Sequence, residues 1–149
     1  MYVLNKGLKG ELDDETVFKI SSGFCGGMGG REGPCGALTG AATMIGLFLS
    51  PHSKNGLSKK MARLATKELH DSFKEKLASI NCADLTNKFR NQRKARIKNC
   101  QKITGIGAEI SATIILKNRP DLIAQADHDF LTATDTTLKA FTRANAALC

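Results

Sequence analysis

The chain has 149 residues, of which 42% are hydrophobic and none is tryptophan, so it suits one domain whose core is packed mainly by small and aliphatic side chains. A formal net charge of +8 favours acidic partners such as nucleic acid, anionic lipid or an acidic protein. The longest apolar run, residues 41–49, is too short to span a bilayer, which needs about 20 residues. The first ten residues lack the apolar centre of a secretory signal, so we expect a soluble cytoplasmic protein.

The first predicted helix covers about residues 13–22. Asp13 has the side chain of a good helix cap, and acidic residues follow it, where they favour the positive end of the helix dipole. We expect Val17, Ile20 and Phe24 to face inward.

A glycine-rich loop ends this helix and leads into a second one. Its glycines, which tolerate backbone angles that other residues resist, are Gly23, Gly26, Gly27, Gly29, Gly30 and Gly33. Pro34 fits the first turn of the next helix, which should end at about Ser50. Small residues recur there at four-residue spacing, so another helix should approach closely at Gly36, Ala37, Gly40 and Ala41.

Apolar residues at helical spacing continue through the rest of the chain. They predict a long amphipathic helix over 58–80, a stripe over 82–89, a helix seam over 100–114, and shorter helices over about 120–131 and 135–148. No strand-like alternation occurs. We therefore predict an all-α, single-domain bundle of about six helices, with the glycine-rich loop between the first two.

The chain has five cysteines, Cys25, Cys35, Cys82, Cys100 and Cys149, and none forms a C-x-x-C pair. In a reducing compartment they are expected as thiols or metal ligands rather than structural disulfides. Cys35 lies at a predicted helix start, where unpaired N–H groups and nearby Arg31 should lower its pKa. The plain alternative is that Cys25 and Cys35 are inert, buried fillers.

Two segments outside the cysteines have binding potential. The glycine loop could bind an anion or cofactor through Gly26, Gly27, Gly29, Gly30 and Arg31, but it lacks a nucleotide-binding motif and is equally explained as a tight connection. The basic segment 88–98 holds six Lys or Arg residues and no acid. It is a solvated face or a dock for an acidic redox partner rather than a nucleic-acid site, because it lacks base-stacking aromatics.

Three stretches together resemble the C_GCAxxG_C_C family of redox-active proteins. They are LDDETVFKISSGFCGGMGGREGPCGALTGAATMIGL over residues 12–47, FKEKLASINCADLT with Cys82, and KNCQKITGIGAEI with Cys100. The resemblance covers about residues 12–116 and leaves a helical extension over 117–149 that contains Cys149. It implies a small helical protein with redox chemistry at its cysteines. A related segment occurs in split-Soret cytochromes c, which makes an iron–sulfur cluster or another metal the implied cofactor.

The family's first cysteine would lie upstream of Leu12, and this sequence has none there. Either the start of the sequence is truncated or the site works with fewer ligands, and Cys25 is then the expected fourth member beside Cys35, Cys82 and Cys100. The four would form either an iron–sulfur or metal centre, or a dithiol/disulfide centre in which Cys35 is the attacking thiolate.

Two alternatives remain open at this point. In one, the protein is a non-enzymatic binding module that uses the glycine loop and segment 88–98 to bind an anion, nucleic acid or an acidic protein. In the other, it is a helical packing subunit with inert cysteines.

Overall fold

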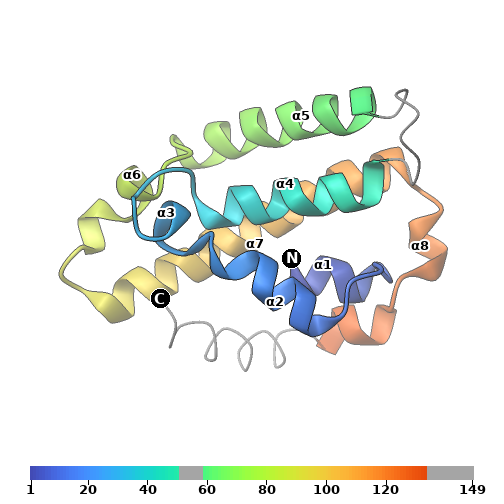
Figure 1. The fold of residues 1–149 in the computed structure, drawn as a ribbon, viewed down its shortest axis with the longest axis horizontal. Helices are drawn as coiled ribbons and strands as arrows, with labels where there is room; N and C mark the ends of the chain where they lie inside the picture. Colours follow the sequence, from blue (N-terminus) through green and yellow to red (C-terminus); the bar gives the residue numbers. More distant parts are fainter. Residues whose placement is uncertain (51–58, 134–149) are drawn as a thin grey trace.

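The computed structural model describes residues 1–50 and 59–133, which form helices and contain no strand (Figure 1). The prediction of an all-α fold is therefore confirmed, and the predicted helix over 135–148 lies outside the described residues. The elements are α1 (Tyr2–Gly7), α2 (Asp14–Ser22), α3 (Cys25–Met28), α4 (Gly36–Leu49), α5 (Lys59–Leu77), α6 (Cys82–Thr86), a 3₁₀ turn η1 (Asn87–Phe89), α7 (Arg93–Asn118) and α8 (Leu122–Gln125).

Helices α4, α5 and α7 pack along one another and form the centre of the molecule (Figure 1). Each contributes side chains that are almost wholly inaccessible to solvent: Met44 and Ile45 from α4, Leu69 and Phe73 from α5, and Ile115 from α7. Burial of such side chains is the main favourable contribution to folding. This three-helix core supports the site, because α3, α6 and the beginning of α4 lie together at one of its ends (Figure 1).

Small residues allow α4 to approach its neighbours closely, as the sequence predicted. A Cβ atom added at Gly107 of α7 would lie 3.1 Å from the carbonyl oxygen of Ala37. A Cβ atom added at Gly36 would lie 2.7 Å from the carbonyl oxygen of Phe24. These backbones are in contact where α4 begins, so the surroundings of Cys35 are tightly packed.

Three predicted helix boundaries were wrong, each for a local reason. Pro34 precedes the N-cap residue Cys35 instead of lying in the first turn of α4. Helix α5 ends at Leu77, three residues early, because Ala78 adopts the left-handed φ of 65°. The helix expected over 120–131 is interrupted after α8, because Ala126 has the extended angles φ −60° and ψ 143°.

The segment after α8 returns to α1. The backbone N–H of Asp127 donates to the carbonyl oxygen of Gly7 at 2.8 Å, and the Asp127 carboxylate lies 2.7 Å from the ammonium nitrogen of Lys9. The chain beyond α7 is thereby joined to the N-terminal helix. None of the helices among the described residues combines the length and apolar character needed to cross a membrane.

Candidate thiol site

Two cysteines lie at helix starts that are joined by a short antiparallel bridge between Pro34 and Asn81. The backbone N–H of Cys35 donates to the carbonyl oxygen of Ile80 at 2.7 Å, and the N–H of Cys82 donates to the carbonyl oxygen of Gly33 at 2.7 Å. Proline fits the bridge position because its missing N–H is not needed there. In an antiparallel pair the residues that flank the bridge point to one face, so Cys35 and Cys82 extend to the same side.

The glycine-rich loop packs directly on Cys82. A Cβ atom added at Gly27 would lie 2.6 Å from the Cys82 Cβ, and Gly27 also has a left-handed φ of 73°. The N–H of Ala83 donates to the Glu32 carbonyl oxygen at 3.1 Å, so the loop also caps the first turn of α6. The loop therefore needs glycine at residue 27 for two reasons, close approach and backbone conformation.

The third thiol comes from α7. Cys100 lies about two turns after the start of this helix, and the neighbouring Asn99 side chain donates to the Leu85 carbonyl oxygen at 2.9 Å, which ties α7 to the end of α6. Cys35, Cys82 and Cys100 are all free thiols. Cys82 is 6% exposed, whereas the other two are half-buried. Two reachable sulfurs thus accompany a buried one.

The pKa of Cys35 is raised, which corrects the expectation of a lowered value. Burial is the largest cause, and a negative charge on Cys82 raises the pKa further. Hydrogen bonds from the N–H groups of Ala37 and Leu38 act in the lowering direction, as expected at a helix start, but they do not outweigh burial. The predicted direction was wrong because burial outweighs the helix-start effect, and the sequence does not reveal how deeply the thiol is buried.

The three thiols are close enough to influence one another electrostatically. The pKa of Cys100 is raised by burial first, and then by negative charge on Cys82 and on Cys35. The positive charge of Arg96 acts in the opposite direction. Charge on Cys82 thus acts on both other thiols and charge on Cys35 acts on Cys100, so the structure places the three cysteines within electrostatic range of one another.

Cys25, the expected fourth member, differs from these three. It lies at the start of α3, is half-buried, and its sulfur is disulfide-bonded, so it is not among the three free thiols. The sequence favoured a thiol or metal ligand over a structural disulfide at this residue, and the structure has Cys25 in a disulfide instead. Its role as a member of the redox site stays a prediction.

The glycine-loop N–H groups that were predicted to bind an anion already donate hydrogen bonds within the loop and its flanks. Gly27 donates to the carbonyl oxygen of Phe24, Gly29 to that of Gly23, and Gly30 to that of Cys25. The Arg31 N–H donates to the Met28 carbonyl oxygen. An anion would have to replace these bonds, so the loop has a clear structural role, while anion binding, including at Gly26, stays a prediction.

The side chains of the thiol site do not have the geometry of a site for a single metal ion. Within residues 1–50 and 59–133, no group of three or more His, Cys, Asp or Glu side chains has the arrangement to hold one metal ion. In this conformation Cys35, Cys82 and Cys100 do not form a ready-made single-ion site, although thiolates are suitable ligands for zinc and for iron–sulfur clusters.

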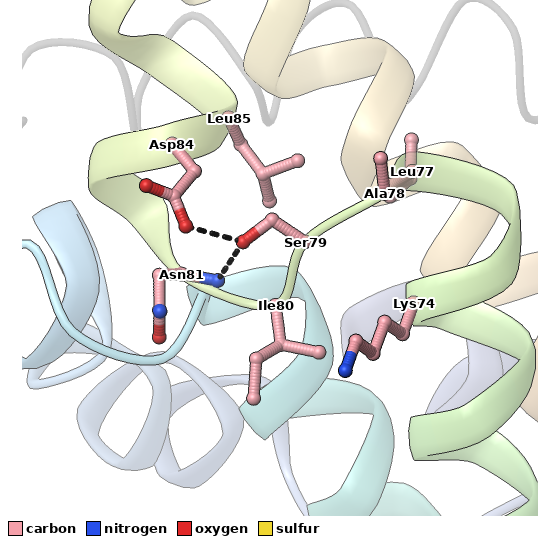
Figure 2. Close-up of a pocket in the computed structure, with 8 residues that line it drawn as sticks. All are labelled: Lys74, Leu77, Ala78, Ser79, Ile80, Asn81, Asp84 and Leu85. Atoms are coloured by element: carbon pink, nitrogen blue, oxygen red, sulfur yellow. Dashed lines mark hydrogen bonds between the residues drawn. The ribbon is translucent and has the colours of Figure 1, made fainter.

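An open pocket of about 580 Å³ lies beside the 78–81 connector that leads to Cys82. In Figure 2 the Ser79 hydroxyl stands between the Asp84 carboxylate, to which it donates at 2.6 Å, and the Asn81 N–H, from which it accepts at 3.1 Å. The side chain of Lys74 extends toward Ile80. None of the pocket-lining residues is a cysteine, so the three free thiols do not line this pocket.

Sequence reasoning assigned Arg96 only to the basic segment 88–98 and missed its place at the site. The structure places that segment in η1 and the beginning of α7, with Arg96 half-buried and its charge acting on Cys100. The sequence contained the signal for this placement: Arg96 and Cys100 are four residues apart, and residues at that spacing lie on the same face of a helix.

The comparison with known protein families gives one match. The family model described as "Putative redox-active protein (C_GCAxxG_C_C)" matches residues 1–114. The match confirms the resemblance and extends it to the N-terminal residues before Leu12, while the end of α7 and everything after it lie outside. No curated protein and no solved structure is significantly similar to the chain.

Proposed function

The chain belongs to the C_GCAxxG_C_C family of redox-active proteins, and from this premise we propose that it is a thiol–disulfide exchange protein that reacts through Cys35, Cys82 and Cys100. The observation that carries the proposal is the grouping of three free thiols at the α4, α6 and α7 junction, where the Pro34–Asn81 bridge holds two of them on one face. Two reachable thiols beside a buried one suit a reaction that needs an attacking and a resolving sulfur.

The reaction balances without a metal. A thiolate at Cys35 or Cys100 attacks one sulfur of a substrate disulfide, R–S–S–R, and forms a mixed disulfide as the first R–S⁻ leaves and takes up a proton. The thiolate of Cys82 then attacks the protein sulfur of that mixed disulfide, which releases the second R–S⁻, again protonated in solution. The protein dithiol is oxidised to an internal disulfide and the substrate is reduced to two thiols. A dithiol donor would reverse the change.

The burial pattern supports these roles. Cys82, at 6% exposure and covered by the Gly27 backbone, is protected from external disulfides and suited to the resolving step. The N–H groups of Ala37 and Leu38 act to lower the pKa of Cys35, against the effect of burial, and so favour its thiolate once it forms. Cys100 has the Arg96 charge nearby, which has the same effect.

The test is to incubate the anaerobically purified protein with a neutral aromatic disulfide and to locate new disulfides by mass spectrometry of peptides. The wild type should contain an internal disulfide between Cys82 and Cys35 or Cys100. Cys82→Ser should form no such bond and should accumulate mixed disulfides at Cys35 and Cys100.

Two results would reject the proposal. One is a wild-type protein in which these three thiols form mixed disulfides but never an internal bond. The other is a purified protein whose iron and sulfide are lost in Cys35→Ser, Cys82→Ser and Cys100→Ser alike, which would instead establish the iron–sulfur centre that the sequence also allows.

A further inference from the structure

Arg96 occupies an unusual position for a charged residue of the basic segment. It lies one turn before Cys100 on α7, and residues separated by four share a helix face. Its side chain is half-buried, whereas Lys94 and Lys98 on either side of it are exposed. Its positive charge acts to lower the pKa of Cys100. Arg96 therefore faces the thiol site, and its neighbours face solvent.

Within the part of the chain that the structure describes, the Arg96 guanidinium makes no ion pair with a carboxylate. No acidic residue occurs between Asp84 and Glu109, so the neighbouring turns of α7 offer Arg96 no carboxylate. Across the α3–α6 end, Glu32 lies 3.9 Å from Arg90, not from Arg96. A partly desolvated guanidinium with five N–H donors and no carboxylate beside it is suited to bind a carboxylate from outside.

The charge around Arg96 strengthens this attraction. All the charged side chains between Asp84 and Glu109 are positive: Lys88, Arg90, Arg93, Lys94, Arg96, Lys98 and Lys102. Such a field raises the local concentration of anions and repels cations. The field alone would not distinguish one anion from another, but Arg96 adds a directional contact next to a reactive sulfur.

We propose that Arg96 binds the carboxylate of a low-molecular-mass disulfide and so directs anionic disulfides to Cys100. This inference rests on the proposed function and names the class of its substrate. The Cys100 thiolate attacks the nearer sulfur of the bound disulfide, the S–S bond breaks, and the leaving thiolate is protonated in solution. The carboxylate of the retained half stays on Arg96 until the Cys82 thiolate displaces it as a second thiol.

The experiment compares three disulfides with the full chain: 5,5′-dithiobis(2-nitrobenzoate), which is dianionic, 4,4′-dithiodipyridine, which is neutral, and cystamine, which is cationic. The quantity measured is the rate constant for mixed-disulfide formation at Cys100, located by mass spectrometry. Rates with the anionic reagent are divided by rates with the neutral one, because this ratio cancels any change in the reactivity of the Cys100 thiolate.

Arg96→Gln should lower the anionic-to-neutral ratio by about tenfold, the factor expected for one charge-assisted contact. The matched control is Lys94→Gln, which removes the same charge two residues away on the exposed side of α7 and should change the ratio by less than about twofold. Arg96→Lys keeps the charge, loses the planar fork and should give an intermediate ratio, so it serves the test if the Gln variant is unstable.

An unchanged ratio in Arg96→Gln overturns the inference, and so does an equal fall in Lys94→Gln, which would indicate general charge attraction. The proposed function fails on a separate observation, namely the absence of an internal disulfide after treatment with the neutral reagent. Because the ratio is read at the first step, it tests Arg96 whether or not Cys82 completes the second.

Discussion

Cys82 illustrates how the surroundings of one residue determine the chemistry of the site. Its N–H holds the bridge to Gly33, its Cβ touches the backbone of Gly27, and its charge raises the pKa of both other free thiols. A sulfur in this position is poorly reached from outside, which suits the resolving role that we propose for Cys82. The three cysteines are therefore unequal, although the sequence presents them as similar.

The first prediction concerns the pH dependence of thiol reactivity. Because the pKa values of Cys35 and Cys100 are raised above that of an ordinary cysteine, their thiolate fractions at neutral pH are below that of a free cysteine peptide. Alkylation by a neutral reagent, measured residue by residue with mass spectrometry, should rise about tenfold per pH unit from pH 7 to pH 9. A rate that levels off below pH 8 at either residue would show a lowered pKa instead.

The second prediction separates the two reasons for glycine at residue 27. Gly27→Ala places a methyl group against Cys82 in a left-handed backbone, and should reduce the free energy of unfolding by roughly 2–4 kcal/mol in urea denaturation. Gly26→Ala is the matched control, since Gly26 has a φ of 64° and open space around it. It should cost only about 1–2 kcal/mol. Equal losses would show that the contact with Cys82 contributes nothing.

At the scale of the helices, apolar periodicity and capping residues predicted the features that depend on residues close together in the sequence. The α2 boundaries agree with the expectation, and the Asp13 carboxylate accepts from the Thr16 N–H at 2.8 Å, as a helix cap should. The bridge between Pro34 and Asn81 escaped prediction because it pairs two single residues far apart in the chain, and such a pair has no alternating pattern. The end of α5 was missed because Ala78 replaces the glycine that commonly ends a helix.

That last discrepancy leads to the third prediction. Ala78 is exposed and has φ 65°, so glycine should relieve the backbone strain without loss of packing. The relief of backbone strain in the folded state should exceed the stabilisation of the unfolded chain by the extra conformational entropy of glycine. Ala78→Gly should therefore stabilise the protein by about 0.5–1 kcal/mol in urea denaturation. Ala95→Gly, inside α7, should instead destabilise it by about 1 kcal/mol. Destabilisation by both changes would argue against the left-handed end of α5.

For the whole molecule, the family resemblance drew attention to Cys35, Cys82 and Cys100, and the composition and apolar periodicity predicted the all-α fold. Neither predicted which sulfur is buried, because the burial of Cys82 results from the packing of α3, α4 and α6 at one end of the core. The raised pKa of Cys35 was missed for the same reason. Arg96 is the opposite case, since its four-residue spacing from Cys100 was visible in the sequence and only its burial was not.

The final prediction concerns the ion pair between Lys9 and Asp127, which joins the segment after α8 to the N-terminal part of the chain. Asp127 pairs with Lys9, and its carboxylate also accepts from the Phe130 N–H at 2.9 Å, so it is a structural residue. The hydrogen bond from Lys9 is the largest cause of its lowered pKa. A carboxyl group with a lowered pKa stabilises the folded state above its unfolded pKa, near 4, and this contribution disappears as pH falls through the folded-state value.

Asp127→Asn should therefore lower the Tm at pH 7, and the difference from the wild type should shrink progressively below pH 4 and in high salt. Asparagine can still accept from the Phe130 N–H, so the change isolates the charge. Asp129→Asn is the control, because Asp129 makes no ion pair among the residues that the structure describes. If the two variants melt alike at pH 7, the Lys9 pair does not hold the segment after α8 against α1. A Tm difference that persists unchanged at low pH would assign the effect of Asp127→Asn to something other than its charge.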